Sequence, residues 1–171
     1  RGELVPLSEL VREVGKDAAR FFLLMRSADS SLDFDLELAK QQSAENPVYY
    51  VQYAHARICS ILRMAEEEAV RVPTAVEVDL SLLGHESELE LIRKLADWPE
   101  EVERAALAYE PHRLTSYAMD LAALFHVFYR DCRVLGESSE LTAARLVLVK
   151  AAKSVLANVL GMMGVSSPDR M

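Results

Sequence analysis

The chain has 171 residues, of which 51% are hydrophobic, and its formal net charge is −8 at pH 7. This length predicts one domain, or one domain and a small appendage, and the hydrophobic fraction is sufficient for a sizeable core. The acidic balance argues against a protein that grips long stretches of phosphate backbone. It is compatible with reading a few unstacked bases of a single-stranded loop by stacking and shape.

The N-terminus and the cysteines bear on the compartment. The first residues have no apolar segment typical of a signal peptide, and the missing initial methionine suggests a fragment. No apolar run approaches the roughly 20 residues that a membrane span needs. Cys59 and Cys132 are far apart in helical stretches, so they predict two free thiols, which fit a reducing compartment. We therefore expect a cytoplasmic protein whose partners include neither a membrane nor DNA.

The first part of the chain predicts short helices. Residues 6–14 favour a helix that begins at a proline and ends before Gly15, and residues 17–26 favour a second one. Residues 32–36 alternate apolar and acidic side chains, but this stretch is too short to found a sheet. Asp35 is a candidate N-cap for a helix through residue 40.

Long amphipathic helices follow. Asn46 as the N-cap and Pro47 at the first helical position begin a helix that runs to about residue 69. Residues 72–79 break the pattern and form the best internal linker. Further helices are expected over residues 86–96, 98–109, 111–132 and 141–163, and the segment that begins at Asp97 is expected to cap the second of these.

The last two helices carry apolar residues at helical spacing. One stripe consists of Leu114, Tyr117, Leu121, Leu124, Phe125, Phe128 and Cys132, and the other of Leu141, Leu148, Val155, Val159 and Met162. Gly164 is the expected residue just past the end of the final helix. Because no strand pattern competes with these stripes, the sequence predicts an all-α fold, a helical bundle.

The sequence contains no catalytic motif: it has no glycine-rich phosphate loop, no G-x-S-x-G and no H-E-x-x-H. His55 and Cys59 lie one helical turn apart and could share a metal ion, but without a second ligand pair nearby core packing is the preferred interpretation. An acidic cluster lacks the glycine of a calcium loop, so capping explains it better; it consists of Asp29, Asp33, Asp35 and Glu37. We expect no catalytic residue and no metal.

A group of aromatic residues allows two interpretations. Tyr49, Tyr53 and Ala56 follow the spacing i, i+4, i+7, so they share one face of a helix. The rings could pack in the core with their hydroxyls hydrogen-bonded. They could instead form a platform on which bases stack, with the small alanine leaving room for a flat ligand. The residues alone favour packing.

Several stretches of the sequence resemble a known family. Residues 14–27, VGKDAARFFLLMRS, resemble the stretch after the second ATP-binding signature loop of class I arginyl-tRNA synthetases. Residues 45–58, ENPVYYVQYAHARI, are the most specific match. Residues 128–135, FYRDCRVL, and the ending 168–171, PDRM, are also similar to the family. The resemblance covers essentially the whole chain and is weakest over residues 72–111.

The resemblance implies a C-terminal anticodon-binding domain of the DALR type over residues 46–171, preceded by connector helices over residues 1–45. The expected partners are the anticodon loop of a tRNA and the catalytic domain of the same chain. The parent enzyme would join arginine to its tRNA with ATP and Mg²⁺. Both ATP-site signatures of the family are absent from this sequence, so we expect an inactive fragment with no cofactor of its own.

The site residues are implied by the same resemblance. The expected anticodon-binding residues are Tyr49, Ala56, Tyr129 and Met171, followed by Tyr53 and Arg57. Two alternatives remain. One is the anticodon domain of a related synthetase such as the cysteinyl or methionyl enzyme, against which the run 46–58 argues. The other is a helical protein-interaction domain without RNA contact, which the acidic charge favours.

Overall fold

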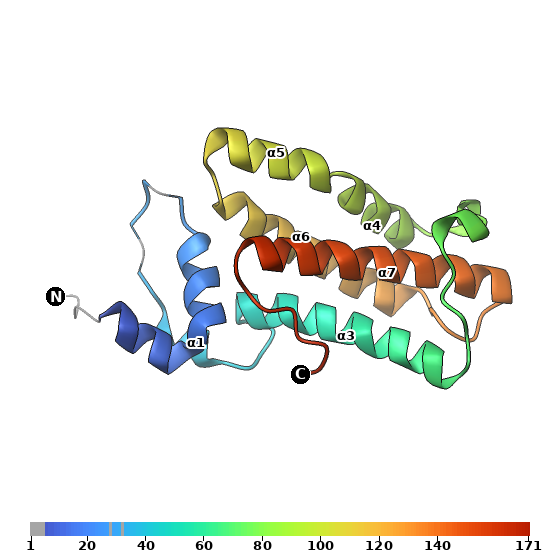
Figure 1. Cartoon of the computed structure of the whole chain (residues 1–171), viewed down its shortest axis with the longest axis horizontal. Coiled ribbons are helices and arrows are strands. Elements are labelled where there is room, and N and C mark those ends of the chain that lie inside the picture. Colours follow the sequence, from blue (N-terminus) through green and yellow to red (C-terminus); the bar gives the residue numbers. More distant parts are fainter. Residues whose placement is uncertain (1–5, 28, 32) are drawn as a thin grey trace.

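The computed structural model describes residues 6–27, 29–31 and 33–171, and in these residues helices alternate with loops and no strand occurs. In chain order the elements are α1 (Leu7–Leu24), α2 (Leu36–Lys40), α3 (Pro47–Glu67), the 3₁₀ turns η1 (Ala75–Glu77) and η2 (Leu80–Leu82), α4 (Glu86–Ala96), α5 (Trp98–Ala108), α6 (His112–Asp131) and α7 (Ser139–Met162) (Figure 1). The all-α prediction is confirmed. None of the described helices is both long and apolar enough to cross a membrane.

Most helix boundaries follow local signals in the sequence. The Asn46 side chain accepts hydrogen bonds from two backbone N–H groups of α3, and Pro47 occupies its first turn, as predicted. Asp35 caps α2 in the same way. Gly15 has a φ of 81° and a ψ of 162°, so it breaks α1 into the two predicted pieces. Asp97 forms no side-chain cap, because its own backbone is helical between α4 and α5; its predicted capping role is wrong.

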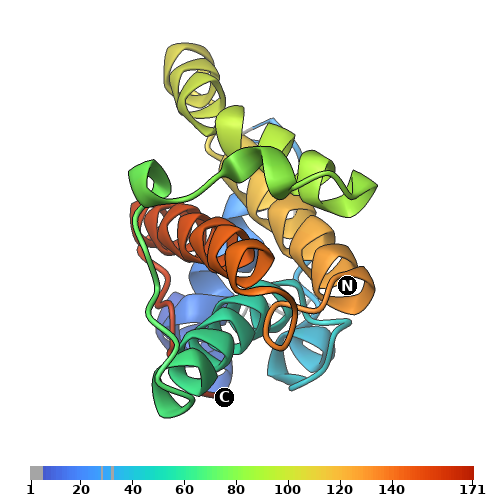
Figure 2. The same cartoon turned by 90° about the vertical axis from the view of Figure 1, so that its right-hand side faces the viewer.

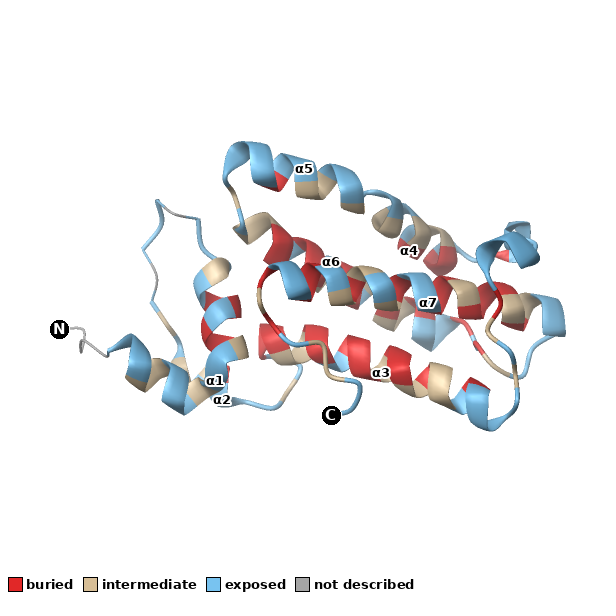
Figure 3. Ribbon diagram, in the orientation of Figure 1, coloured by how far each residue is buried: buried red, intermediate tan, exposed pale blue. Residues whose placement is uncertain are grey.

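The helices α3, α6 and α7 pack against one another, α4 contacts both α6 and α7, and α5 packs on α6. Figure 2 shows this arrangement end-on, and in Figure 3 the buried positions gather on α3, α6 and α7, whereas α5 is mostly exposed. The fully buried side chains of α6 include Leu121, Phe125 and Phe128, which join one core cluster with Leu146 and Leu156 of α7. Burying each such side chain contributes about 1.5–3 kcal/mol.

The predicted apolar stripe of α7 is only partly correct. Leu148 and Val159 are buried, but Leu141 and Val155 are half-buried and Met162 is 54% exposed. A helix with neighbours on several sides buries more than one face. The core of α7 is therefore wider than the stripe and also includes Ala144, Leu146, Val149, Ala152, Leu156 and Leu160.

One ion pair lies inside the bundle. The Glu88 carboxylate on α4 is 1% exposed, and Nε of Arg145 on α7 donates to it at 2.7 Å. Arg145 also donates to the Arg133 carbonyl at 2.7 Å, and Glu88 accepts from the backbone N–H of His85 at 2.8 Å. The pair thus joins two helices to the loop after α6, a link that the sequence did not indicate.

The last residues, 164–171, turn back and run along α3 (Figure 1). Gly164 has a φ of 68°, which allows the reversal and confirms its predicted place after α7. A Cβ at this position would meet Nε of Arg20 at 2.7 Å. The same Nε donates to the Met163 carbonyl at 2.7 Å, so α1 helps to hold the turn.

Candidate nucleic-acid interface

A column of flat side chains runs along α3 to the end of α6. The rings of Tyr49 and Tyr53, one turn apart, are nearly parallel, with centroids 6.3 Å apart and an interplanar angle of 8°. The Arg57 guanidinium lies 4.8 Å from the Tyr53 ring centroid and 4.9 Å from that of Tyr129. It also donates a hydrogen bond to the Tyr53 hydroxyl. Such a series of rings and a planar cation offers faces on which flat ligands stack.

Five of the six predicted site residues line one hollow between α3, the end of α6 and the C-terminal tail. Its volume is about 300 Å³, and its lining consists of Tyr53, Ala56, Arg57, Ser60, Ile61, Met64, Tyr129 and Met171. Ala56 is buried, whereas Tyr129 is 40% and Met171 51% exposed. The alanine thus lies on the floor, and the tyrosine and the terminal methionine stand at the rim.

The sixth predicted residue, Tyr49, lies in a neighbouring hollow of about 500 Å³. Tyr53 and Arg57 line both hollows, so the two adjoin each other. A third hollow of about 530 Å³ shares Tyr129 with the central one and extends to the loop after α6. We call these three hollows together the aromatic groove.

His126 borders the hollow of Tyr49, with its ring centroid 5.0 Å from that of Tyr50 and 6.1 Å from that of Tyr53. Burial lowers the pKa of His126, and the positive charge of Arg57 lowers it further, so the imidazole is neutral at pH 7. Its Nε2 is buried and has no hydrogen-bond partner within the described residues. Burial also raises the pKa of the Tyr50 hydroxyl, which keeps the neutral form.

The charge along the groove is partly compensated. Arg130 and Arg133 line the outer hollow, but Arg130 forms an ion pair with Asp131 at 2.7 Å. Glu68 borders the same hollow. The groove therefore combines several flat faces with a modest excess of positive charge, which suits bases better than a long phosphate backbone.

Some lining residues were not predicted as site residues: Ser60, Ile61, Met64 and His126. A signal existed for two of them, because Ser60 and Met64 continue the helical face of Tyr53 and Ala56 at intervals of four residues. His126 lies one turn before Tyr129 on α6, so it could have been found from that position. Ile61 continues Tyr53 and Arg57 at the same interval, but an apolar side chain at this position is expected in the core, and Ile61 is indeed only 4% exposed.

The fold and the groove together are those of a helical domain suited to binding flat ligands such as nucleobases. The comparisons with known proteins are more specific. Residues 51–171 match the family model described as the DALR anticodon binding domain. Because this match covers most of the chain, the chain belongs to the DALR anticodon-binding domain family.

The relatives are consistent with this family. The chain is 60% identical over 174 residues to an arginine–tRNA ligase of Heliobacterium modesticaldum, covering 99% of this chain and 31% of that protein. It is 58% identical over 170 residues to the arginine–tRNA ligase of Moorella thermoacetica, covering 99% and 30%. The arginyl-tRNA synthetase structure from Thermus thermophilus aligns with a TM-score of 0.77 and 33% identity, over 94% of this chain and 27% of that one.

The resemblance seen in the sequence is thereby confirmed. The chain spans only about 30% of the length of the two curated relatives, and it matches their C-terminal part. None of these comparisons assigns a role to an individual side chain of the aromatic groove.

Proposed function

We propose that this chain is the anticodon-binding module of an arginine–tRNA ligase and that the aromatic groove receives unstacked bases of the anticodon loop. The observation that carries this proposal is the placement of Tyr53, Ala56, Arg57, Tyr129 and Met171 around one hollow. These residues come from two helices and the C-terminus. Their convergence supports a binding role over the packing role that their sequence pattern alone favoured.

Each side chain suits a different part of that task. The faces of Tyr53 and Tyr129 can stack on bases, and Arg57, between them, adds a planar cation that also stacks. Ala56 leaves the floor open to a flat ring. Met171 offers a soft wall that adapts to the edge of a base. Tyr49 extends the stacking surface into the adjoining hollow.

The activity of the whole protein is part of the same proposal. The relatives are named arginine–tRNA ligases, and the remaining part of such a protein would attach arginine to tRNA with ATP and Mg²⁺. The partners of this chain would then be the anticodon loop and the catalytic domain of its own polypeptide. A translation enzyme of this kind would work in the cytoplasm, which agrees with two free cysteines.

The test is direct binding of anticodon stem-loops to the chain and to the full-length ligase that carries it. We expect a stem-loop with an arginine anticodon to bind more tightly than one with another anticodon. Tyr129→Ala should cost about 1–3 kcal/mol of binding through lost stacking. Tyr109→Ala is the matched control, because Tyr109 is a 90% exposed tyrosine at the end of α5 that does not line the groove.

Equal affinity of the wild type and Tyr129→Ala for the arginine stem-loop would contradict the proposal. So would a lack of preference between the two stem-loops. If the chain binds no RNA at all but associates with other proteins, the interaction-domain alternative replaces it.

A further inference from the structure

We infer that Gln52 and Asp169 are positioning residues which fix the C-terminal tail on α3 so that Met171 stands at the rim of the aromatic groove. This inference rests on the proposed function of the groove. The tail lies against a face of α3 next to the one that carries the tyrosines. Gln52, His55, Cys59 and Arg63 follow one another along this face, and each contacts the tail.

The first anchor joins the tail to α1 as well as to α3. The Gln52 amide donates hydrogen bonds to the Ser166 carbonyl at 2.9 Å and to the Asp17 carboxylate at 3.0 Å. The Ser166 hydroxyl donates to the same carboxylate. One glutamine thus connects two segments that are 149 positions apart in the chain.

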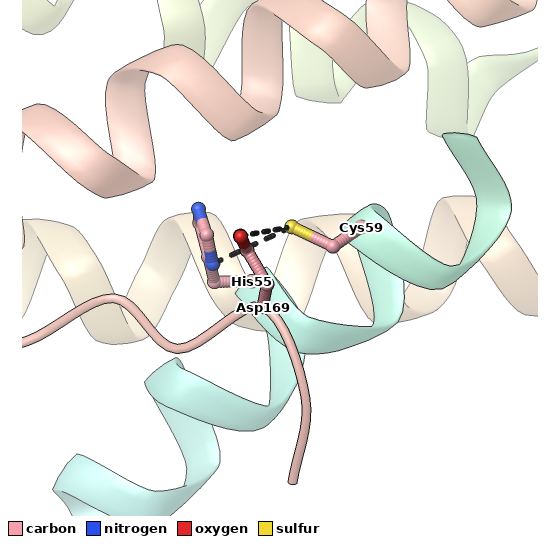
Figure 4. A group of neighbouring side chains, drawn as sticks. All are labelled: His55, Cys59 and Asp169. Carbon is pink, nitrogen blue, oxygen red and sulfur yellow. Dashed lines mark hydrogen bonds between the residues drawn. The ribbon is translucent and has the colours of Figure 1, made fainter. Parts of the chain in front are cut away.

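The second anchor lies two residues before the C-terminus and is drawn in Figure 4. Nδ1 of His55 is 3.0 Å from the Pro168 carbonyl, and the Cys59 thiol donates to the Asp169 carboxylate at 3.1 Å. Arg63 donates to the Asp169 carbonyl at 3.3 Å, and Nζ of Lys153 on α7 lies 3.7 Å from its carboxylate. Asp169 is therefore held through both its side chain and its backbone.

A metal ion is the other possible explanation of this cluster, because the ligand atoms of His55, Cys59 and Asp169 all lie within 4.8 Å of one another. The hydrogen bonds favour an anchor for the tail over a metal site. A carbonyl only accepts, so Nδ1 of His55 carries a proton, and burial raises the pKa of the Cys59 thiol. A metal at Nδ1 would also leave Nε2–H of His55 buried without an acceptor in the described part of the chain.

The anchor at Asp169 limits where the Met171 side chain can lie. An extended chain advances at most about 3.6 Å per residue, so Met171 lies within about 7 Å of its anchored neighbour Asp169. An unanchored terminus would fray and leave the rim of the groove open on that side. Anchoring at Asp169 therefore replaces a mobile methionine by one that is already in place when RNA arrives, which lowers the entropy cost of binding.

The test exploits two effects of opposite sign. Removing a negative charge near an RNA site should by itself strengthen RNA binding. If Asp169 positions Met171, Asp169→Ala should instead weaken binding of the arginine stem-loop to the full-length ligase by about fivefold. Asp169→Asn, which retains an acceptor for the Cys59 thiol, should recover part of this loss.

Asp120→Ala is the matched control, because Asp120 is an exposed carboxylate on α6 that also pairs with a lysine, Lys94, at 2.8 Å. It changes the charge by the same amount and should leave binding unchanged or slightly tighter. In a double-mutant cycle, adding Asp169→Ala to Met171→Ala should cause no further loss, since the aspartate acts through the methionine.

Three results would overturn the inference. Asp169→Ala could bind like Asp120→Ala while Tyr129→Ala loses binding, which would leave the groove as the RNA site without a contribution from the tail. The losses of Asp169→Ala and Met171→Ala could add. Cobalt(II) could produce a thiolate charge-transfer band that Cys59→Ala abolishes, which would make the cluster a metal site. If Tyr129→Ala also has no effect, the proposed function fails as well.

Discussion

Two carboxylates of this chain, Glu88 and Asp169, each have more than one polar partner, but they lie in opposite surroundings. Glu88 is 1% exposed inside the bundle and is bound by Arg145. The Asp169 side chain is 74% exposed on the C-terminal tail, beside Lys153. Burial, more than the number of partners, therefore decides what a carboxylate contributes to stability.

The physical reason is the cost of desolvation. A buried charge that loses its partner has no water to replace it, so breaking the pair affects the whole fold. An exposed charge is screened by water and salt, so its loss changes little beyond its own surroundings. We therefore assign Glu88 to stability and Asp169 to the position of the tail.

The largest expected effect comes from Glu88→Ala, which leaves the Arg145 guanidinium buried and uncompensated. It should lower the free energy of unfolding by about 3–5 kcal/mol. Urea denaturation followed by circular dichroism measures this. Glu90→Ala, which removes an exposed carboxylate paired with Arg93 on the same helix, should cost less than about 1 kcal/mol. Equal losses of stability for the two variants would contradict the conclusion that burial decides the contribution of a carboxylate.

A double variant separates the charge from the packing. In the double variant Glu88→Leu/Arg145→Met no unpaired charge remains. Its free energy of unfolding should therefore be about 2 kcal/mol higher than that of Glu88→Leu alone. The recovery should be incomplete, since the Arg133 carbonyl and the His85 N–H lose their partners as well. If the double variant is less stable than Glu88→Leu, the ion pair does not explain the role of Glu88.

A smaller, local effect is expected on acidification. The hydrogen bond from Cys59 lowers the pKa of Asp169, with help from the charge of Lys153. Burial raises the pKa of Asp17, but hydrogen bonds from Ser166 and Gln52 outweigh it and lower the pKa. Lowered carboxyl pKa values mean that docking of the tail is strongest above the ordinary aspartate value of about 3.9 and is lost as pH falls below it.

The methyl resonance of Met171 reports this docking in a pH titration. It should stay constant from pH 7 to about 5 and move toward its free-peptide position only below about pH 4. Release of the tail between pH 5 and 7 would point to a histidine and would remove the two aspartates as its anchors.

The smallest effect concerns salt. Because the groove cations are few and partly paired, RNA binding should involve no more than about four phosphate contacts. With a slope of about 0.7 per phosphate for single strands, log Kd should then change with log salt by less than about 3. Filter binding at a series of salt concentrations measures the slope. A slope twice as steep would indicate a basic surface outside the aromatic groove.

Much of the fold follows from local sequence signals, and the site follows only in part. Asn46, Pro47 and Gly15 act within a few residues of themselves, so their effects could be predicted. The face shared by Tyr49 and Tyr53 follows in the same way from helical spacing.

Contacts between distant residues were not predictable, because a single sequence does not show which helices meet. Arg145 and Glu88 are 57 positions apart, and Cys59 and Asp169 are 110 apart. For the same reason the sequence did not show that α7 buries more residues than its predicted stripe, since the neighbours of α7 come from separate parts of the chain. Met171 could be named from the family resemblance, but the reason it stays in place lies in these distant contacts.

Methyl NMR on the six methionines of the chain can show directly whether RNA binds in the aromatic groove. Met64 and Met171 line the central hollow, whereas the exposed Met162 lies beside Trp98 in a different part of the surface. On addition of an arginine anticodon stem-loop, the resonances of Met64 and Met171 should shift and that of Met162 should not. Shifts at Met162 with none at Met64 and Met171 would place the RNA elsewhere and exclude the aromatic groove as its binding site.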